Sequence, residues 1–394
     1  MTASRPSKHA SVAHGIRRLT RRDLLEDRLT ITPRLRAALP GTTPGVILLR
    51  VLAGALLALL LGTTAAAVPA QPTVTFAWAY RAGDYVRGQP AAAGKIVYAG
   101  SDDHALHAVD ADTGAAVWSF ETADNVTASP ALAGDTLYVA SWDGAIYAVA
   151  AATGRPDWQY DTGGWVTASP VISGGMVYAG SNDGVFYALA AGNGTLAWRY
   201  RTGARIQAGA AVSGDTIFFG SADGYLYALD SAHGELRWRY PAAGGVVTAP
   251  AFADGSVYAG SLERRFYALD AVTGRPRWSF AADGAFESSP AVAGGTVYVG
   301  ADDGRLYALR TSDGSLLWQY QAGNMIRSSP AVWGPLVFVG SDDGYVYGLD
   351  RETGALAWRY RTGGAIAAGV TVAGNHLYVS STDRRLHAFT LATR

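Results

Sequence analysis

Tryptophan recurs every 40 residues through most of the chain, and this spacing constrains the fold more than any other feature of the sequence. No insertion or deletion interrupts the period between residues 78 and 358. A fixed period of about 20–50 residues indicates stacked structural repeats, because one unit of that length cannot bury its own apolar face. The eight tryptophans are Trp78, Trp118, Trp158, Trp198, Trp238, Trp278, Trp318 and Trp358.

One repeat contains the pattern of four short strands. Apolar and polar residues alternate in Thr296–Gly300 and Arg305–Leu309, and Asp302–Gly304 between them is typical of a tight hairpin turn. A short strand is expected at Glu287–Ala293 and a fourth at Leu316–Tyr320. Four antiparallel strands per repeat are typical of a β-propeller blade.

The phase of the repeats predicts how the ring closes. Thr75–Tyr80 matches a fourth strand and Arg385–Phe389 matches a third strand, so the last blade lacks a fourth strand of its own. The N-terminal strand can complete that blade and leave no open seam in the ring. We therefore expect an all-β fold, a closed eight-bladed β-propeller of four-stranded antiparallel blades at 75–394, preceded by one N-terminal hydrophobic helix.

The repeat sequence resembles a known family. The motif Asp-x-x-Thr-Gly-x-x-x-Trp stands at Asp110–Trp118, Asp270–Trp278 and Asp350–Trp358, and it is similar to the pyrroloquinoline-quinone-type (PQQ-like) propeller repeat. This resemblance implies that each tryptophan docks onto a neighbouring blade. The family contains both enzymes and non-enzymes, so the fold alone does not determine function.

Two branches of the family imply different functions. The chain resembles the eight-bladed scaffold of the outer-membrane β-barrel assembly machinery more than the quinoprotein dehydrogenases, which bind PQQ with calcium and carry insertions that roof the site. This chain has no insertion and no cysteine. We expect a non-catalytic extracytoplasmic scaffold that binds an envelope protein or peptide and needs no cofactor. The alternative is a PQQ- or other ligand-dependent oxidoreductase, or a ligand sensor.

Charge and hydropathy set the first part of the chain apart. Residues 1–50 carry ten basic and three acidic side chains, which leaves 22 basic and 29 acidic residues in the remainder. A basic flank before an apolar run orients the run with its N-terminus in the cytoplasm. We predict a basic cytoplasmic arm at 1–45, disordered or partly helical, a hydrophobic segment at 46–68 and a short linker at 69–74.

The hydrophobic segment has two interpretations. As a retained signal anchor, 46–68 crosses the cytoplasmic membrane once and holds the propeller outside. As a signal peptide cleaved near Ala70, it leaves a periplasmic or secreted ring. The apolar run is slightly short for a span, and the region before it is long for a signal peptide.

Composition excludes several classes of function. The absence of cysteine excludes disulfides, thiolate metal sites and thiol nucleophiles. A formal net charge of zero gives no general attraction to nucleic acid. We expect no catalytic residue, no metal site, no nucleic-acid partner and a monomeric ring.

The candidate binding residues are those that differ between blades at equivalent positions. Two positions at the start of the innermost strand vary freely, while the Ser-Pro that follows is nearly uniform. Variation frees these positions for one asymmetric surface at the channel mouth, and aromatic and arginine side chains are enriched in binding hot spots. The predicted binding residues are Tyr85, Arg87, Asn125, Trp165, Arg205, Gln207, Glu287, Met325 and Arg327.

Other polar residues receive a structural interpretation. An aspartate recurs in the hairpin turn of nearly every blade, as at Asp103, so it is expected to serve the turn. His107 and His387 replace a repeated tyrosine and are expected to be packed blade residues. Trp142 and Trp333 also depart from the repeat, and Trp142 lies beside a hairpin turn where it offers a second contact.

Overall fold

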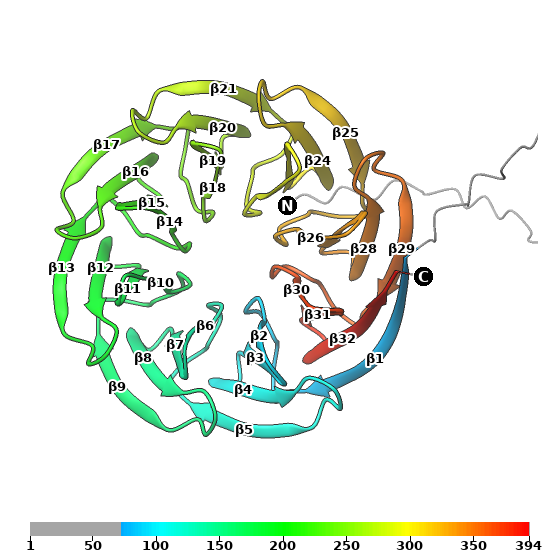
Figure 1. Cartoon of the computed structure of the whole chain (residues 1–394), viewed down its shortest axis with the longest axis horizontal. Helices are drawn as coiled ribbons and strands as arrows, with labels where there is room; N and C mark the ends of the chain where they lie inside the picture. Colours follow the sequence, from blue (N-terminus) through cyan, green and yellow to red (C-terminus); the bar gives the residue numbers. More distant parts are fainter. Residues whose placement is uncertain (1–71, 394) are drawn as a thin grey trace, which may run out of the picture. The chain divides into compact units, whose positions relative to one another are not determined.

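The computed structural model describes residues 72–393, and every regular element in that range is a β-strand. Eight four-stranded antiparallel sheets form the blades of a propeller ring, as Figure 1 shows. Blade 1 holds β2–β5, and the following blades take four strands each up to blade 7 with β26–β29. Blade 8 holds β30–β32 together with β1. The prediction of a closed eight-bladed propeller is confirmed.

Strands at equivalent places in the blades have nearly equal lengths. The innermost strands are β2 (Ala91–Ala93), β6 (Ala131–Ala133), β10 (Val171–Ser173), β14 (Ala211–Ser213), β18 (Ala251–Ala253), β22 (Ala291–Ala293), β26 (Ala331–Trp333) and β30 (Thr371–Ala373). The second strands are β3 (Ile96–Gly100), β7 (Thr136–Ala140), β11 (Met176–Gly180), β15 (Thr216–Gly220), β19 (Ser256–Gly260), β23 (Thr296–Gly300), β27 (Leu336–Gly340) and β31 (His376–Ser381). The third strands are β4 (Ala105–Asp110), β8 (Ala145–Ala150), β12 (Val185–Ala190), β16 (Tyr225–Asp230), β20 (Arg265–Asp270), β24 (Arg305–Arg310), β28 (Tyr345–Asp350) and β32 (Arg385–Ala392). The outer strands are β5 (Ala116–Glu121), β9 (Pro156–Asp161), β13 (Leu196–Arg201), β17 (Leu236–Pro241), β21 (Pro276–Ala281), β25 (Leu316–Gln321), β29 (Leu356–Arg361) and β1 (Thr73–Arg81).

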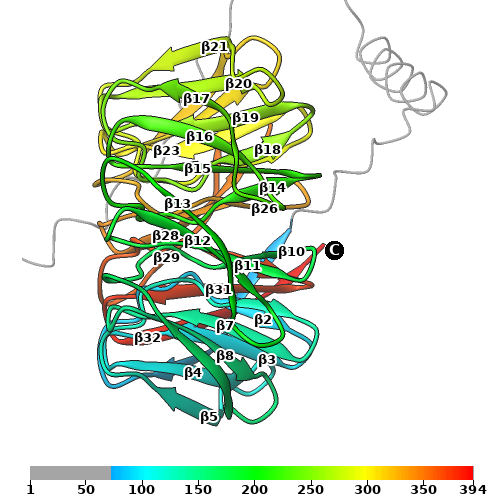
Figure 2. The ribbon, with the colours of Figure 1, turned by 90° about the vertical axis from the view of Figure 1, so that its left-hand side faces the viewer.

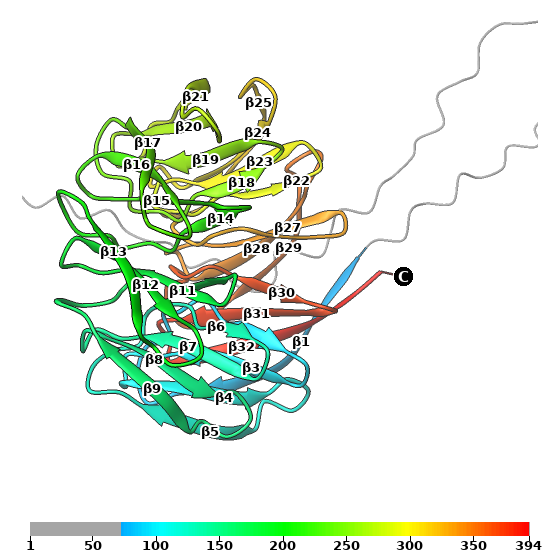
Figure 3. The same ribbon diagram turned by 60° about the vertical axis from the view of Figure 1, so that its left-hand side comes forward.

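The first strand closes the ring. β1 pairs antiparallel with β32, from Thr73 opposite Ala392 to Arg81 opposite Arg385. Figure 3 shows the start of β1, in blue, and the end of β32, in red, running side by side. The closing strand begins two residues before the predicted Thr75, and it covers the edge that β32 would otherwise expose.

The apolar core lies between blades as well as within them. In one core cluster Tyr178 and Phe186 of blade 3 pack with Ile217 and Phe219 of blade 4. The rings of Phe186 and Phe219 stack with their centroids 4.1 Å apart. Because each sheet buries one face against the next blade, the ring is the smallest unit that buries every sheet.

Tryptophans of the outer strands lock neighbouring blades together. Trp158 on β9 donates its Nε1–H to the carbonyl of Ala191 in blade 3, at 2.9 Å, and Tyr138 donates its hydroxyl to the same carbonyl at 3.1 Å. Gly194 lies under the Trp158 ring with a positive φ of 71°, and a Cβ there would stand 2.6 Å from the indole. The repeated Gly and Trp are thus two halves of one contact between blades.

The ring has two faces, which Figure 2 shows from the side. We call one the mouth face; it carries the hairpins between second and third strands, such as 101–104, and the connections between blades, such as 122–130. We call the other the turn face; it carries the turns between first and second strands and between third and fourth strands, such as 111–115. Antiparallel pairing puts these two sets of loops at opposite ends of every blade.

Most predicted strands match the structure, and the largest difference is in the first strand of blade 6. The strand predicted at Glu287–Ala293 is only Ala291–Ala293, because Pro290 has no N–H for the ladder. The predicted arm at 1–45 and hydrophobic segment at 46–68 lie outside the described residues. Among residues 72–393 no helix is long and apolar enough to span a bilayer.

Candidate functional site

The candidate site is the mouth face around the central channel. Two kinds of segment meet there and bond through their backbones: the N–H of Asp102 donates to the Tyr85 carbonyl at 2.8 Å, and the N–H of Val126 donates to the Ser101 carbonyl at 3.1 Å. The first bond joins segments of blade 1, and the second joins blade 1 to blade 2. Equivalent bonds recur around the ring. The variable side chains therefore stand on a rigid frame.

A cavity of about 440 Å³ occupies the centre of the ring on the mouth side of the innermost strands. Arg87, Glu287 and Arg327 supply its charged groups, and Gln89 and Thr127 add polar groups. The rest of the lining is small, mainly Ala, Gly, Ser and Pro. Small residues leave the channel open for a ligand or an inserted side chain.

The predicted binding residues fall into two sets. Three of them, Arg87, Glu287 and Arg327, line the cavity. The others do not line it; five of them stand at the first variable position, which in these connections is not on a strand and need not share a face with the second. These others are Tyr85, Asn125, Trp165, Arg205, Gln207 and Met325.

Two tryptophans form an aromatic pair at the mouth. Trp142 of blade 2 stacks on Trp165, which leads into blade 3, with ring centroids 5.1 Å apart and planes 14° apart. Trp142 donates its Nε1–H to Thr127 Oγ1 at 2.7 Å, which fixes its orientation. The Trp165 side chain is 52% exposed. Trp142, predicted as a second contact, and Trp165, predicted as a binding residue, therefore lie together in one aromatic platform.

A charged cluster stands in blades 6 and 7. Arg327 Nε lies 3.2 Å from Asp302 and 3.4 Å from Glu287, and Arg327 Nη1 lies 3.7 Å from Asp342. Arg327 Nη2 also contacts Met325 Sδ at 3.0 Å. Three carboxylates around one guanidinium leave this part of the mouth with a net negative charge.

The acids of this cluster are held at an electrostatic cost. Burial raises the pKa of Glu287 and of Asp342, and the nearby Arg327 only partly offsets it because Asp302 adds repulsion. Asp342 Oδ1 is buried and has no hydrogen-bond partner among the described residues. A cationic group brought by a partner would relieve this repulsion.

A separate charged pair stands in blade 1. Arg87 Nε lies 2.6 Å from Asp102 Oδ2, and its guanidinium lies 5.1 Å from the centre of the Tyr85 ring. Burial raises the pKa of Asp102, although Arg87 lowers it in part. Across the mouth in blade 4, Arg205 bonds Gln207 at 2.9 Å. The mouth thus has different chemistry on each side.

The sequence prediction missed a third variable position. The position immediately before the turn aspartate holds Asp102, Asp302 and Asp342 in three of the blades. The prediction named only Trp142 at this position. The signal was available, because this position also changes from blade to blade. Trp333 lies at the end of β26 near the turn face, where it packs against the core.

The histidines and turn aspartates serve the blades. His107 and His387 are buried, and the Nε2 of each lies 3.0 Å from Asp103 and Asp383 respectively. In other blades tyrosine takes this role, as where Tyr147 donates its hydroxyl to an aspartate at 2.7 Å. The expectation of packed blade histidines is confirmed.

The acidic groups of the mouth can be compared with what a calcium site for PQQ requires. Calcium takes six or more oxygen ligands, yet within 72–393 no group of three or more His, Asp or Glu side chains is arranged to hold a metal ion. The three carboxylates of blades 6 and 7 converge on the guanidinium of Arg327, so they do not surround a point that is free for a metal ion.

Comparison with known proteins identifies the family. A family model described as outer membrane protein assembly factor BamB matches residues 101–248, 242–333 and 323–394. The chain belongs to this family. Its repeats therefore bear out the resemblance to PQQ-like propellers, and the scaffold of the assembly machinery is among the proteins it resembles. A search of the curated proteins found no match.

Solved structures share the fold. BamB from Moraxella catarrhalis has a TM-score of 0.71 and 24% identity, covering 81% of this chain and 100% of its own. The computationally designed Ika8 protein has a TM-score of 0.73 and 18% identity, covering 80% and 99%. Quinohemoprotein alcohol dehydrogenase from Comamonas testosteroni has a TM-score of 0.69 and 17% identity, covering 80% and 76%. At these identities the likeness shows the fold alone.

Proposed function

We propose that this BamB-family propeller is a non-catalytic scaffold of the cell envelope that holds a protein or peptide partner at its mouth face. One observation carries the proposal: the positions that vary between blades lie on one face, the mouth face, and three of them, Arg87, Glu287 and Arg327, line its cavity. The tryptophan repeat shows how constant a purely structural position stays. Variable aromatic and arginine residues on a rigid frame are typical of binding surfaces.

The chemistry of the mouth indicates what the partner offers. Trp142 and Trp165 supply a flat apolar platform on one side, suited to an aromatic or aliphatic side chain. Glu287, Asp302 and Asp342 supply excess negative charge on the other side, suited to lysine or arginine. The partner segment therefore carries an apolar group and a basic group separated by the channel.

The envelope location is part of the proposal. It is supported by the family description, outer membrane protein assembly factor BamB, and by the basic flank before the apolar run at 46–68. The run is either retained as an anchor or cleaved near Ala70. The mass and the N-terminal sequence of the mature protein distinguish the two, because an N-terminal tag stays attached to the propeller only when the run is retained.

Capture from envelope extracts tests the scaffold. Full-length protein with Trp165→Ala, or with Arg327→Ala, is expected to recover at least ten-fold less of the partner that the unchanged protein captures. Val117→Ala on β5 is the matched control, because Val117 is 48% exposed and lies away from the mouth. Equal recovery by the control and the Trp165→Ala variant contradicts a partner site at the mouth.

The enzyme alternative has its own test. The fold is shared with quinohemoprotein alcohol dehydrogenases, so an oxidoreductase is the second candidate. PQQ and calcium are added to the purified protein, and the visible spectrum and dye reduction by alcohols are followed. We expect neither a band shift nor turnover. Turnover that depends on both additions would replace the scaffold proposal.

A further inference from the structure

A second pocket lies on the turn face, between blades 4 and 5. Its volume is about 530 Å³, and its walls include Phe218 on β15, Phe252 on β18 and Val272 after β20. Asp215 and Arg237 form its charged side. The pocket shares no residue with the cavity at the mouth.

The apolar floor of this pocket departs from the repeat. Phe252 occupies a position where the other blades carry Ala, Leu, Ile or Val, and Phe218 replaces the usual tyrosine. The two rings stack with centroids 6.2 Å apart and planes 2° apart. Phe252 remains 37% exposed and Val272 85% exposed. Exposed apolar groups gathered in one concave site favour a ligand.

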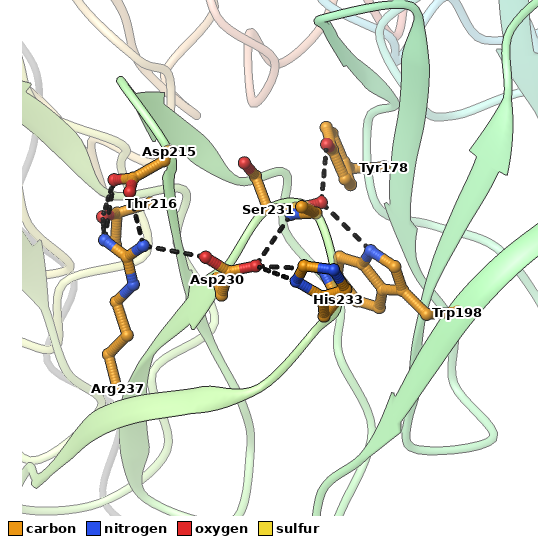
Figure 4. A network of polar contacts seen from close by, with 9 residues as sticks. Tyr178, Trp198, Asp215, Thr216, Asp230, Ser231, His233 and Arg237 are labelled. Atoms are coloured by element: carbon orange, nitrogen blue, oxygen red, sulfur yellow. Dashed lines mark hydrogen bonds and ion pairs between the residues drawn. The ribbon is translucent and has the colours of Figure 1, made fainter.

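A backbone carbonyl in the pocket has spare capacity. Trp238 donates its Nε1–H to the Ala271 carbonyl at 3.0 Å. The equivalent carbonyl of Ser231 accepts from both Trp198 and Tyr178, as Figure 4 shows. Phe218 has no hydroxyl to play the part of Tyr178, so one acceptor site on Ala271 is free of protein side chains within the described residues.

The charged side of the pocket cannot take an anion. Figure 4 shows the guanidinium of Arg237 held by three residues. Its Nη1 donates to Asp215 and Thr216, and its Nη2 donates to Asp215 and Asp230, at 2.7–2.8 Å for the two carboxylates. The four terminal N–H groups are therefore in use. Two carboxylates against one arginine leave a net negative charge.

Asp215 is the carboxylate that faces solvent. Its side chain is 74% exposed, and hydrogen bonds from Arg237 hold its pKa at about 2, so it stays charged at neutral pH. Each carboxylate oxygen has acceptor capacity beyond its bond to Arg237. The pocket thus offers an apolar floor, a free carbonyl and an exposed negative charge.

We propose that this pocket binds an apolar side chain and an adjacent lysine or arginine of an extended peptide segment. The apolar side chain lies on Phe252 and Val272, the cationic group lies against Asp215, and a peptide N–H donates to the free acceptor site of the Ala271 carbonyl. A peptide is the source that the geometry favours, because the exposed Val272 and Asp215 leave the rim open to a chain passing over it. This site stands independently of the function proposed for the mouth.

Short blocked peptides test the chemistry by calorimetry on the full-length protein in mild detergent. The acetylated and amidated peptide Gly-Phe-Arg-Gly is expected to bind at least five-fold more tightly than Gly-Phe-Glu-Gly and than Gly-Ala-Arg-Gly. Equal affinity for the Arg and Glu peptides would overturn the cation requirement. Equal or tighter binding of free phenethylammonium would overturn the peptide assignment in favour of a small amine.

Substitutions locate the binding. Phe218→Tyr restores the hydroxyl used in other blades, so it is expected to occupy the Ala271 carbonyl and weaken the Gly-Phe-Arg-Gly complex at least five-fold without lowering the melting temperature. Phe252→Ala weakens it similarly, and Asp215→Asn removes the preference for Arg over Glu. Ile172→Ala, the same repeat position in blade 3, is the control. Unchanged affinity in both phenylalanine variants contradicts the site, and Trp165→Ala at the mouth leaves this binding intact.

Discussion

At the scale of single residues, a backbone carbonyl of one blade accepts side-chain hydrogen bonds from the blade before it. The Ala191 carbonyl accepts from Trp158 and from Tyr138, which both belong to the preceding blade. The Ala271 carbonyl accepts from Trp238 but from no tyrosine, because Phe218 stands in that place. Equivalent contacts in one molecule thus differ by a single hydroxyl.

This difference makes a paired prediction. Trp158→Phe and Trp238→Phe both lose an indole, but only the second leaves the carbonyl that it bonded with no side-chain donor. Trp238→Phe is expected to lower the free energy of unfolding by about 1 kcal/mol more than Trp158→Phe. Urea denaturation of the two variants measures the difference. Equal losses would mean that water replaces the indole N–H at the Ala271 carbonyl without a cost.

A second prediction concerns Asp103, whose carboxylate contacts His107 beside the closing strand. Burial alone raises the pKa of Asp103, but hydrogen bonds from His107 and from the Gly83 N–H outweigh it and hold this pKa at about 2, below its ordinary 3.8. His107 Nδ1 lies 3.1 Å from the Tyr80 hydroxyl on β1, so the carboxylate supports the seam of the ring.

The sign follows from the lowered pKa. A carboxyl group with a depressed folded-state pKa stabilises the protein above about pH 4, and this contribution is lost as the pH falls toward 2. After allowance for solvent screening it amounts to about 1 kcal/mol. Asp103→Asn is expected to flatten the fall of the melting temperature between pH 4 and pH 2. An unchanged pH profile in this variant would contradict a role for Asp103 in closure.

At the scale of elements, each turn between third and fourth strands is shaped by the neighbouring blade. A Cβ added to Gly194, in the turn after β12, would lie 2.6 Å from the Trp158 ring. Gly214 in the turn after β14 also has a positive φ, of 58°, but nothing lies within 4 Å of its Cβ position. Comparing alanine at these two glycines therefore separates the cost of a strained backbone from the cost of a steric clash.

Alanine at these glycines provides the third prediction. Gly214→Ala carries only the strain of positive φ, about 1 kcal/mol. Gly194→Ala carries the same strain and also displaces the Trp158 indole, so we expect a further loss of about 1–3 kcal/mol. Thermal unfolding followed by tryptophan fluorescence measures both. A cost for Gly194→Ala no larger than for Gly214→Ala would show that the indole moves freely.

Elements were predictable from the sequence where local chemistry repeats. Alternation in Thr296–Gly300 and the Asp-Gly turn after it specify a hairpin without reference to the rest of the chain. The contacts of Arg327 with Asp302 and Asp342 were not predictable, because they depend on how blades 6 and 7 curve toward the channel. The pocket of blades 4 and 5 likewise requires knowing that Phe218 and Phe252 stack across a blade boundary.

At the scale of the whole molecule, ring closure makes eight blades into one cooperative unit. β1 and β32 are separated by most of the chain, yet they are paired over most of their length. A chain cut before residue 73 keeps this pairing and is expected to melt as the full-length protein does. A chain beginning at residue 82 lacks β1 and exposes the edge of β32.

The truncation at residue 82 supplies the fourth prediction. We expect a melting temperature at least 10 °C lower, broader unfolding and concentration-dependent association, since the free edge pairs with other chains. A synthetic peptide of Thr73–Arg81 added in trans is expected to restore part of the stability. Calorimetry and size-exclusion chromatography follow both effects. Full stability without β1 would mean that inter-blade packing alone closes the ring.

The position of β1 also has a mechanical consequence. Thr73 lies at the turn face, and β1 runs from there to Arg81 at the mouth face. If the preceding segment anchors the protein, a load between the membrane and a partner held at the mouth pulls β1 along its own axis. The eight register pairs with β32 then share the load in shear rather than opening one after another. In that case the strand that closes the ring would also carry the load, and the ring would resist detachment along the direction in which its partner pulls.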